Sequence, residues 1–579
     1  MNVDTLRQGW LIRRDESVRA GLYPGPDRVP ARSPLSPSGA DSDAGSEAQY
    51  DNEPMQAYAL TIDKFLAHAA KWHGDVEIIS ASGSGAPQRI GYAALCERAN
   101  RLSGAFLALG VSPGECVATL AWNTQAHMEA YYAAMGAGLI CHTLNPRLTP
   151  AHLSEMINLA EDRVLAVAAN LAPLVSELLP LCPGVEHVIW LDEPSSIQSC
   201  KRQPDVKFWD YDTLLLELGR ETAWGQFDEN QPAGLCFTSG TTGKPKGVLY
   251  THRSNYLHTL RALQADAVAL TGQETLLVAV PMFHANGWGL PFAAPAVGAK
   301  LVLPGRQADG ASLARLMRDE RVTLAAGVQT VWLGLLDHLD ETGEDLPDLK
   351  RILIGGSKCP ASLIERMQTR LGVTVQTSWG MTELSPVGAI APPGMADGMT
   401  ETAGLAPMGL DLLLTDAQGQ PLPVQRNVTG HLKVRGHSVV GEYFKSGGSA
   451  LDENGYFDTG DLAVIDSQGR LTITGRSKDL IKSGGEWINP AEIEDIVGRQ
   501  PEISQVAVIG KSDPKWGERP ILVVEPSLGH SPDTQSLRQL LKGHVADWWI
   551  PDEMIVVEAM PLAPTGKIDK RKLRRDYSS

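Results

Sequence analysis

A stretch near the middle of the chain carries a dense set of groups that could bind polyphosphate. It holds three glycines, four hydroxyl side chains and two lysines, in the order Thr238, Ser239, Gly240, Thr241, Thr242, Gly243, Lys244, Pro245, Lys246 and Gly247. Glycine lets backbone N–H groups approach an anion, hydroxyls add donors, and lysine supplies positive charge. An ordinary polar turn needs far fewer donors, so this composition indicates a phosphate-binding loop.

The loop differs from the Walker A loop of P-loop nucleotide triphosphatases. That pattern requires Ser or Thr directly after Gly-Lys, whereas Gly243 and Lys244 are followed by Pro245. The apolar run 234–237 precedes the loop, which predicts that a buried strand delivers the chain into it.

Further polar groups follow strand-like runs elsewhere. His284 comes after the apolar run 276–280, and Thr382 and Glu383 come soon after the run 374–377. A hydroxyl can donate to a phosphate oxygen without adding charge, and a carboxylate is a hard ligand for Mg²⁺. Each has a plain structural alternative, because a histidine among apolar residues is more often a satisfied core residue and a Thr-Glu pair can cap a helix.

The elements that must position these groups alternate between helical and strand-like patterns from residue 58 to about 465. Helical spacing and short apolar runs of this kind predict a layered α/β domain, with helices at 60–71 and 93–108 and strands at 117–122, 164–168, 188–191, 276–280, 351–354 and 374–377. A smaller α+β unit follows, with expected strands at 506–509, 521–524 and 554–557 and expected helices at 491–498 and 536–545. Asn489 is the expected N-cap of the helix at 491–498, with Pro490 at its first position.

The domain prediction divides the chain into three parts. Residues 1–54 are rich in Pro, Ser, Gly and Asp, which predicts a disordered extension, and Met55 is a possible start of translation. A chain of 579 residues exceeds what a single core usually holds, so more than one domain is expected; the family resemblance given below implies a large domain at 55–477 and a small one at 478–579.

Composition excludes several classes of function. The formal charge of −17 disfavours nucleic acid as a partner. No apolar run approaches the roughly 20 residues of a membrane span. The seven cysteines are scattered singly, which fits reduced thiols in a cytoplasmic protein better than disulfides or zinc.

Taken together, these segments resemble the signature motifs of the adenylate-forming superfamily, which includes acyl-CoA synthetases, the adenylation domains of peptide synthetases and beetle luciferases. The motifs occur in the superfamily's order, and the resemblance covers about residues 58 to 575. It implies an α/β fold with a large multilayered N-terminal domain and a small mobile α+β C-terminal domain. It also implies that an acid takes AMP from ATP, with Mg²⁺ as cofactor, and that coenzyme A (CoA) then replaces AMP.

The resemblance assigns ATP or AMP binding to the phosphate loop and to later motifs. The implied contacts are Thr238, Ser239, Gly240, Thr241, Thr242, Gly243, Lys246, Gly355, Gly356, Ser357, Ser378, Trp379, Gly380, Met381, Asp461 and Arg476. Glu383 and Thr238 are the implied metal ligands, Thr382 contacts the α-phosphate, and Asp461 accepts hydrogen bonds from the ribose.

The resemblance also gives the small domain two working faces. Lys567, in Pro-Thr-Gly-Lys-Ile, is the implied adenylation lysine, Lys482 belongs to the CoA face, and Lys478 occupies the hinge. The remaining implied CoA contacts are Ser483, Gly484, Gly485, Glu486 and Trp487. We therefore expect the small domain to rotate about Lys478 between the two half-reactions.

The acyl pocket is expected at His284, Gly287, Trp288 and Trp379. Peptide synthetase domains usually carry an aspartate where this chain has His284, so an amino-acid substrate would leave its ammonium unpaired. The two tryptophans favour a short or medium apolar tail, and the combination resembles medium-chain acyl-CoA synthetases and 3-methylmercaptopropionyl-CoA ligases. Arg147 is expected to be structural.

Several alternatives stay open at this stage. An aryl acid such as cinnamate could be the substrate, and a luciferase-like oxygenase or a peptide-synthetase adenylation domain would share the first step. A P-loop kinase or a nucleotide-binding module without activity is the rival of a different class. Relatives in the superfamily are often dimers, so a homodimer is a further expectation.

Overall fold

The computed structural model describes residues 55–56, 58–81, 85–192, 204–238, 245–356, 358–398, 401–483, 486–563 and 567–578. The chain divides into two units, residues 1–57 and 58–579, and all the motifs above lie in the second. The predicted disordered extension at 1–54 lies outside the described residues, and the boundary at 477 stays a prediction.

The phosphate loop belongs to the first of three sheets. In the described part of the chain this sheet has seven strands in the order β7-β6-β5-β3-β4-β8-β9. Their bounds are β3 Cys116–Leu120, β4 Ile140–Thr143, β5 Val164–Val167, β6 His187–Trp190, β7 Lys207–Asp210, β8 Pro232–Thr238 and β9 Lys246–Thr251. All neighbours are parallel except β8 and β9, which form an antiparallel pair around the phosphate loop.

The second sheet carries the other nucleotide motifs. Among the described residues it has thirteen strands, in the order β17-β18-β19-β20-β16-β15-β14-β13-β12-β10-β11-β1-β2. Their bounds are β1 Glu77–Ser80, β2 Gln88–Gly91, β10 Thr275–Val278, β11 Lys300–Leu303, β12 Leu324–Val328, β13 Arg351–Gly355, β14 Thr374–Gly380, β15 Val387–Ile390, β16 Gly404–Leu405, β17 Leu410–Thr415, β18 Thr429–Gly436, β19 Phe457–Ile465 and β20 Arg470–Arg476. The run from β11 to β14 is parallel, which makes this half an α/β layer.

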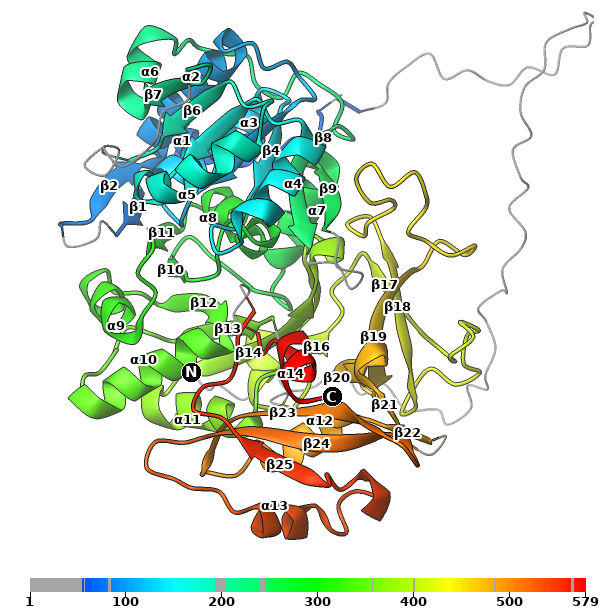
Figure 1. Ribbon diagram of the computed structural model, residues 1–579. Coiled ribbons are helices and arrows are strands. Elements are labelled where there is room, and N and C mark those ends of the chain that lie inside the picture. The colour runs from blue at the N-terminus through cyan, green and yellow to red at the C-terminus, as the bar shows by residue number, and fades with distance from the viewer. Residues whose placement is uncertain are drawn as a thin grey trace, which may run out of the picture. The chain divides into compact units, whose positions relative to one another are not determined.

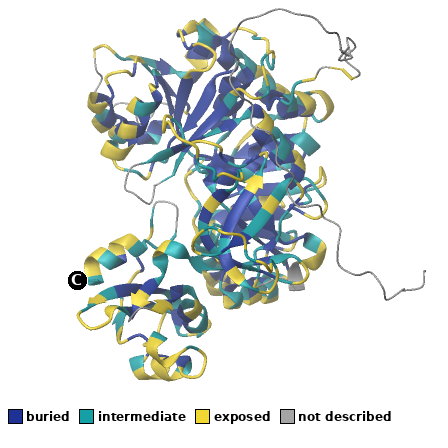
Figure 2. Cartoon of the chain, turned by 90° about the vertical axis from the view of Figure 1, so that its right-hand side faces the viewer, coloured by how far each residue is buried: buried dark blue, intermediate teal, exposed yellow. Residues whose placement is uncertain are grey.

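Helices cover both sheets, as the alternating pattern predicts. Up to residue 371 they are α1 Asp63–Trp72, α2 Tyr92–Ala108, α3 Gln125–Gly136, α4 Pro150–Ala160, α5 Ala172–Leu178, α6 Tyr211–Glu217, α7 His252–Ala262, α8 Leu290–Val297, α9 Gly310–Asp319, α10 Gln329–Thr342 and α11 Ala361–Leu371. The helix α3 packs against β3, β4 and β8, and α11 packs against β14 (Figure 1). In Figure 2 the central strands are largely dark blue, and the buried clusters include residues of β3 to β6 in the first sheet and of β10 to β14 in the second.

The C-terminal part of the chain forms the third sheet, with strand order β22-β21-β24-β23 and with β25 paired to β24. Its elements are β21 Ile481–Ser483, β22 Glu486–Ile488, α12 Pro490–Val497, β23 Ile503–Asp513, β24 Gly517–Pro526, α13 Thr534–Leu541, β25 Glu553–Val556 and α14 Lys570–Tyr577. Asn489 caps α12 by accepting from Ala491 N, as predicted. The helix expected to reach Val545 ends at Leu541, because Gly543 takes a left-handed φ of 79° that a helix does not tolerate.

The strands expected from apolar runs are confirmed with small shifts at their ends. The run 276–280 is β10, and the run 351–354 is β13. In the described residues, no helix is both long enough and apolar enough to cross a membrane.

Candidate active site

The two ends of the phosphate loop face each other. Thr238 ends β8 and Lys246 begins β9, and the two are direct partners in the antiparallel pair. The loop residues Ser239, Gly240, Thr241, Thr242 and Gly243, predicted to bind phosphate, lie outside the described residues. The ammonium of Lys246 lies 4.8 Å from the centre of the Tyr443 ring.

Thr382 and Glu383 form a short 3₁₀ turn, η5 (Thr382–Leu384), beside this hairpin. The hydroxyl of Tyr250, on β9, donates to the backbone oxygen of Thr382 at 2.9 Å. The hydroxyl of Tyr443 donates to Oε1 of Glu383 at 3.0 Å. The strand that leaves the phosphate loop therefore also holds the turn that carries the predicted metal ligand.

The donors near Glu383 fit Mg²⁺ better than a transition metal. No group of three or more His, Cys, Asp or Glu side chains able to hold a metal occurs among the described residues. Mg²⁺ is usually held by one or two carboxylates together with substrate phosphates and water. One buried carboxylate next to a phosphate loop meets that requirement.

Asp461 and Arg476 form the predicted ribose site. They are opposite one another on β19 and β20, and Nε of Arg476 lies 2.7 Å from Oδ1 of Asp461. The indole Nε1 of Trp379 donates to the other oxygen, Oδ2, at 2.9 Å. Burial raises the pKa of Asp461, and the charge of Arg476 opposes that rise. The indole nitrogen and the guanidinium thus hold the carboxylate from two sides.

Lys567 reaches this group of residues from the far end of the chain. Its Cε lies 3.8 Å from the position that a Cβ atom would take on Gly356. Burial lowers the pKa of Lys567 to about 8, the charges of Arg476 and Lys478 add to that effect, and Asp461 and Glu383 oppose it. The structure therefore brings together the glycine turn after β13, the ribose site and the C-terminal lysine. Ser357, the third predicted residue of that turn, lies outside the described residues.

His284 precedes a tight left-handed turn that contains Trp288. The turn is η4 (Ala285–Gly289), in which Asn286, Gly287 and Trp288 have φ of 53°, 58° and 59°. It presents the Trp288 ring to Gly355, where a Cβ would lie 3.1 Å from the nearest ring atom. Burial and the charge of Lys567 lower the pKa of His284 to about 4, so the imidazole is neutral at pH 7.

The structure does not group Trp379 with Trp288. Successive side chains of a strand point to opposite faces. On β14, Ser378 donates to Ile354 O at 2.9 Å, whereas Trp379 packs in a hydrophobic cluster that contains Leu432 and Ala463. Trp288 packs against a different cluster. Trp379 therefore contacts Asp461 through its indole. Its position does not support its predicted role in the acyl pocket. Gly380 and Met381 follow it toward the η5 turn.

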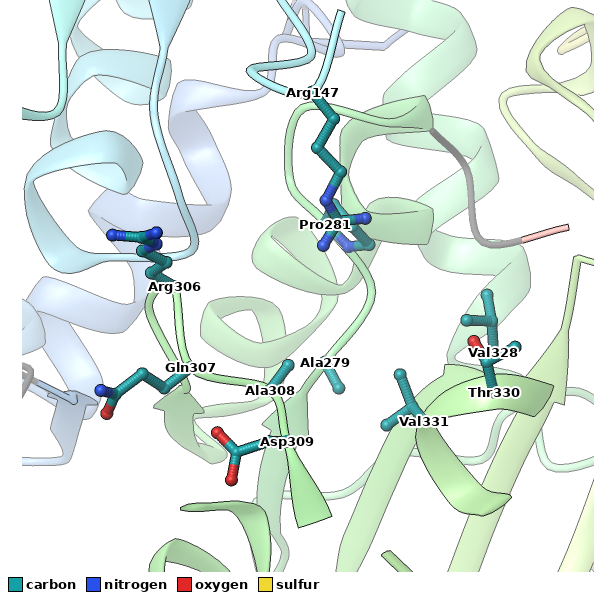
Figure 3. A pocket seen from close by; sticks show the side chains of 10 residues that line it. All are labelled: Arg147, Ala279, Pro281, Arg306, Gln307, Ala308, Asp309, Val328, Thr330 and Val331. Atoms are coloured by element: carbon teal, nitrogen blue, oxygen red, sulfur yellow. The ribbon is translucent and has the colours of Figure 1, made fainter. Parts of the chain in front are cut away.

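A cavity of about 580 Å³ is lined in part by Ala279 and Pro281, which precede His284 in the chain (Figure 3). Its lining is Arg147, Ala279, Pro281, Arg306, Gln307, Ala308, Asp309, Val328, Thr330 and Val331. These residues lie at or beyond the carboxyl ends of β4, β10, β11 and β12. The strand β10 lies between β11 and β12, so the order of the sheet reverses there, and ligands of parallel sheets bind at such points.

Sequence reasoning missed this cavity. Arg147 was expected to be structural, yet it lines the cavity, and its guanidinium lies 5.9 Å from the Phe283 ring. Arg306 belongs to none of the motifs found in the sequence. Their position at the carboxyl ends of strands is a usable signal only when the strand order is known, and that order cannot be read from apolar runs.

The second predicted lysine has a different environment. Lys482 is exposed on β21, and its ammonium lies 5.5 Å from the ring of Trp487, which is 53% exposed. Ser483 is buried and accepts from Arg519 at 3.2 Å, Glu486 is exposed, and Gly484 and Gly485 lie outside the described residues. Lys482 thus does not join the group around Lys567.

The predicted hinge residue, Lys478, lies in η7 (Ser477–Asp479), four residues before Lys482 in the chain. Burial lowers the pKa of Lys478. Among the described residues, ion pairs join Lys358 to Asp495 and Arg499 to Glu401, the latter at 2.7 Å, across the predicted domain boundary at 477.

The chain that carries these residues matches two known protein-family models. Residues 65–444 match the AMP-binding enzyme family, and residues 492–567 match the AMP-binding enzyme C-terminal domain. The chain belongs to the AMP-binding enzyme family. The superfamily resemblance and the α/β fold class predicted from sequence are thereby confirmed.

Relatives of this AMP-binding enzyme include two bacterial ligases. A 3-methylmercaptopropionyl-CoA ligase of Ruegeria lacuscaerulensis is 40% identical over 90% of this chain and 98% of its own length. A medium-chain-fatty-acid–CoA ligase of Ectopseudomonas oleovorans is 40% identical over 90% of this chain and 97% of its own length. The crystal structure of ATP-bound MatB from Rhodopseudomonas palustris superposes with a TM-score of 0.77 at 25% identity and covers 90% of this chain and 99% of that one. The chain is an AMP-forming acid–CoA ligase.

Proposed function

We propose that this enzyme converts a short- or medium-chain carboxylic acid into its CoA thioester through an acyl-AMP intermediate, in the cytoplasm. The observation that carries the proposal is the position of Lys567 beside Gly356 and close to Asp461 and Glu383. A lysine delivered there from the C-terminal domain can act on a nucleotide that lies against the glycine turn.

In the first step, a carboxylate oxygen of the acid attacks the α-phosphorus of ATP. The bond from that phosphorus to the bridging oxygen breaks, and pyrophosphate leaves. Lys567 and Arg476 would offset the negative charge that develops on the phosphate, and Thr382 would donate to it, which is electrostatic catalysis. Asp461 would hold the ribose, with its carboxylate oriented by Trp379.

Mg²⁺, held by Glu383 and the phosphates with Thr238 as a further proposed ligand, would neutralise charge on the phosphate oxygens when it is bound. The buried Glu383 carboxylate beside the hairpin supports this assignment.

In the second step, the thiol sulfur of CoA attacks the acyl carbon of the adenylate. The bond from that carbon to the phosphate oxygen breaks, AMP leaves, and the thiol proton passes to water. The face that carries Lys482, Ser483 and Trp487 would turn to the site for this step. Arg147 and Arg306 support a site for the CoA phosphates in the cavity, since guanidinium groups bind phosphate well, and Asp309 would partly oppose them.

The relatives' names support the choice of acid. One relative is named as a 3-methylmercaptopropionyl-CoA ligase and the other as a medium-chain-fatty-acid–CoA ligase. Trp288, packed on Gly355, and the neutral His284 would border an apolar tail of limited length. A homodimer is part of the proposal, and light scattering of the purified protein tests it.

The experiment measures products from ATP, Mg²⁺ and CoA with butyrate, octanoate, 3-methylmercaptopropionate or cinnamate. The proposal predicts AMP, pyrophosphate and an acyl-CoA, with the highest kcat/KM for octanoate or 3-methylmercaptopropionate. A clear preference for cinnamate would replace the substrate class with aryl acids. Formation of ADP would contradict the reaction itself.

A further inference from the structure

A short segment, residues 440–444, crosses between the exit of the phosphate loop and the Glu383 turn. At one end, the backbone N–H of Phe444 donates to Gly247 O at 2.8 Å. At the other end, the N–H of Val440 donates to Glu383 O, also at 2.8 Å. The approach to β9 is close, because a Cβ on Gly247 would lie 2.9 Å from the Cβ of Phe444. The segment therefore ties two parts of the site to one another.

Tyr443 is the residue of this segment whose side chain contacts charged groups of the site. Its hydroxyl donates to Oε1 of Glu383 at 3.0 Å. The face of its ring receives the ammonium of Lys246 at 4.8 Å from the ring centre, within the range of a cation–π contact. One half-buried side chain thus contacts both the proposed metal ligand and the lysine that ends the phosphate loop.

We propose that Tyr443 is a positioning residue that orients the Glu383 carboxylate for Mg²⁺ and Lys246 for the phosphates. The inference rests on the proposed function, because it takes Glu383 as the metal ligand. A hydrogen bond to Oε1 fixes the plane of the carboxylate and leaves Oε2 available. A neutral donor does this without cancelling the charge that attracts the metal.

Packing of the ring does not account for the hydroxyl. Tyr443 contacts a hydrophobic cluster that includes Val248, Tyr250 and Val440. Phenylalanine at this position would keep that packing and the ring face under Lys246, and it would lose only the hydrogen bond to Glu383. The variant Tyr443→Phe therefore separates positioning of the carboxylate from packing.

The chain offers a matched control. Tyr456 also donates its hydroxyl to a carboxylate, Asp411 Oδ2 at 2.6 Å, and it also carries a cation over its ring, Arg435 at 4.6 Å. Neither of these two partners of Tyr456 is assigned to the nucleotide or to the metal. The variant Tyr456→Phe removes the same kind of hydrogen bond elsewhere in the molecule.

The experiment measures binding of a non-hydrolysable ATP analogue to the full chain by calorimetry over a series of Mg²⁺ concentrations. Thermal unfolding without ligand is recorded for each variant. We expect Tyr443→Phe to need about 10-fold more Mg²⁺ for half-maximal enhancement of analogue binding, which is the usual cost of losing a partner of a metal ligand. Its unfolding temperature without ligand should match that of Tyr456→Phe, and Tyr456→Phe should show the Mg²⁺ dependence of the wild type.

Two results would overturn the inference. One is a Tyr443→Phe variant with the Mg²⁺ dependence of the wild type. The other is a variant with a lower unfolding temperature and weaker analogue binding by the same factor at every Mg²⁺ concentration, which would mark Tyr443 as structural. If the wild type showed no Mg²⁺-dependent enhancement of analogue binding, or if Glu383→Gln kept the Mg²⁺ dependence of the wild type, the assignment of Glu383 under the proposed function would fail instead.

Discussion

Lys567 and Lys482 lie on the same small domain, and their surroundings are opposite. Lys567 lies beside Gly356, among the charges of Arg476 and Asp461, and burial lowers its pKa to about 8. Lys482 is exposed to solvent, and its ammonium lies over the exposed ring of Trp487. One lysine is in a position to act on a nucleotide, and the other is not.

Under the proposed function, the contrast means that a single arrangement of the chain would serve only one half-reaction. The arrangement seen here has Lys567, the proposed adenylation lysine, beside Gly356. Thioester formation by the Lys482 face would require the contacts between Lys358 and Asp495 and between Glu401 and Arg499 to break. The predicted hinge at Lys478 precedes both lysines in the chain, so a rotation about it would move both lysines together relative to the residues before it.

The strongest way to test the contrast is to remove each lysine in turn. Lys567→Ala should slow adenylate formation by about 10³-fold, because the lost charge faces the transferring phosphate. Lys482→Ala should leave that step within about twofold, since an exposed side chain contributes little to a reaction it does not reach. Pyrophosphate release in the absence of CoA gives both rates. Equal losses would remove the distinction between the two faces.

The pH dependence of the first step gives a second test. The ammonium form of Lys567 is the form that offsets phosphate charge, and it is lost as the pH rises through about 8. Adenylate formation should therefore fall by about tenfold per unit above that pH. Lys567→Arg, whose guanidinium stays charged, should lack this fall. A fall of the same size in the arginine variant would assign it to another group.

The ribose site offers a third, smaller effect. Trp379→Phe keeps an aromatic ring and removes the indole hydrogen bond to Asp461. Bonds to charged groups contribute about 1.5 to 3 kcal/mol, so KM for ATP should rise by about 10-fold while KM for the acid changes little. A larger change for the acid than for ATP would return Trp379 to the acyl pocket.

The ion pairs between the domains should give the smallest effect. Lys358→Ala with Glu401→Ala removes two exposed pairs, each contributing at most about 1 kcal/mol. Adenylate formation should slow by about threefold, and thioester formation from supplied acyl-AMP should quicken, because the other orientation becomes easier to reach. Rapid-quench measurements resolve both steps. Slowing of both would show that the pairs only stabilise the fold.

Sequence alone predicted the local parts of this site well. The strands that deliver the phosphate loop, the glycine turn and the Thr382 turn follow from apolar runs and glycines, and Asn489 with Pro490 gave the start of α12. These features depend on neighbours in the chain, where propensity and capping operate.

Features that depend on tertiary contacts could not be predicted. The cavity between Arg147 and Arg306 exists because β10 lies between β11 and β12, and the partner of Trp379 follows from the face of β14 on which it lies. Tyr443 meets Glu383 only because residues 440–444 cross from β9 to η5. No spacing in the chain encodes such meetings.

Chemically prepared acyl-AMP gives the most direct test of the central claim, that Lys567 serves the first half-reaction alone. With acyl-AMP and CoA supplied, Lys567→Ala should form acyl-CoA within about twofold of the wild type, and Lys482→Ala should be slowed at least about tenfold. A Lys567→Ala variant as defective in this second step as in the first would contradict the account.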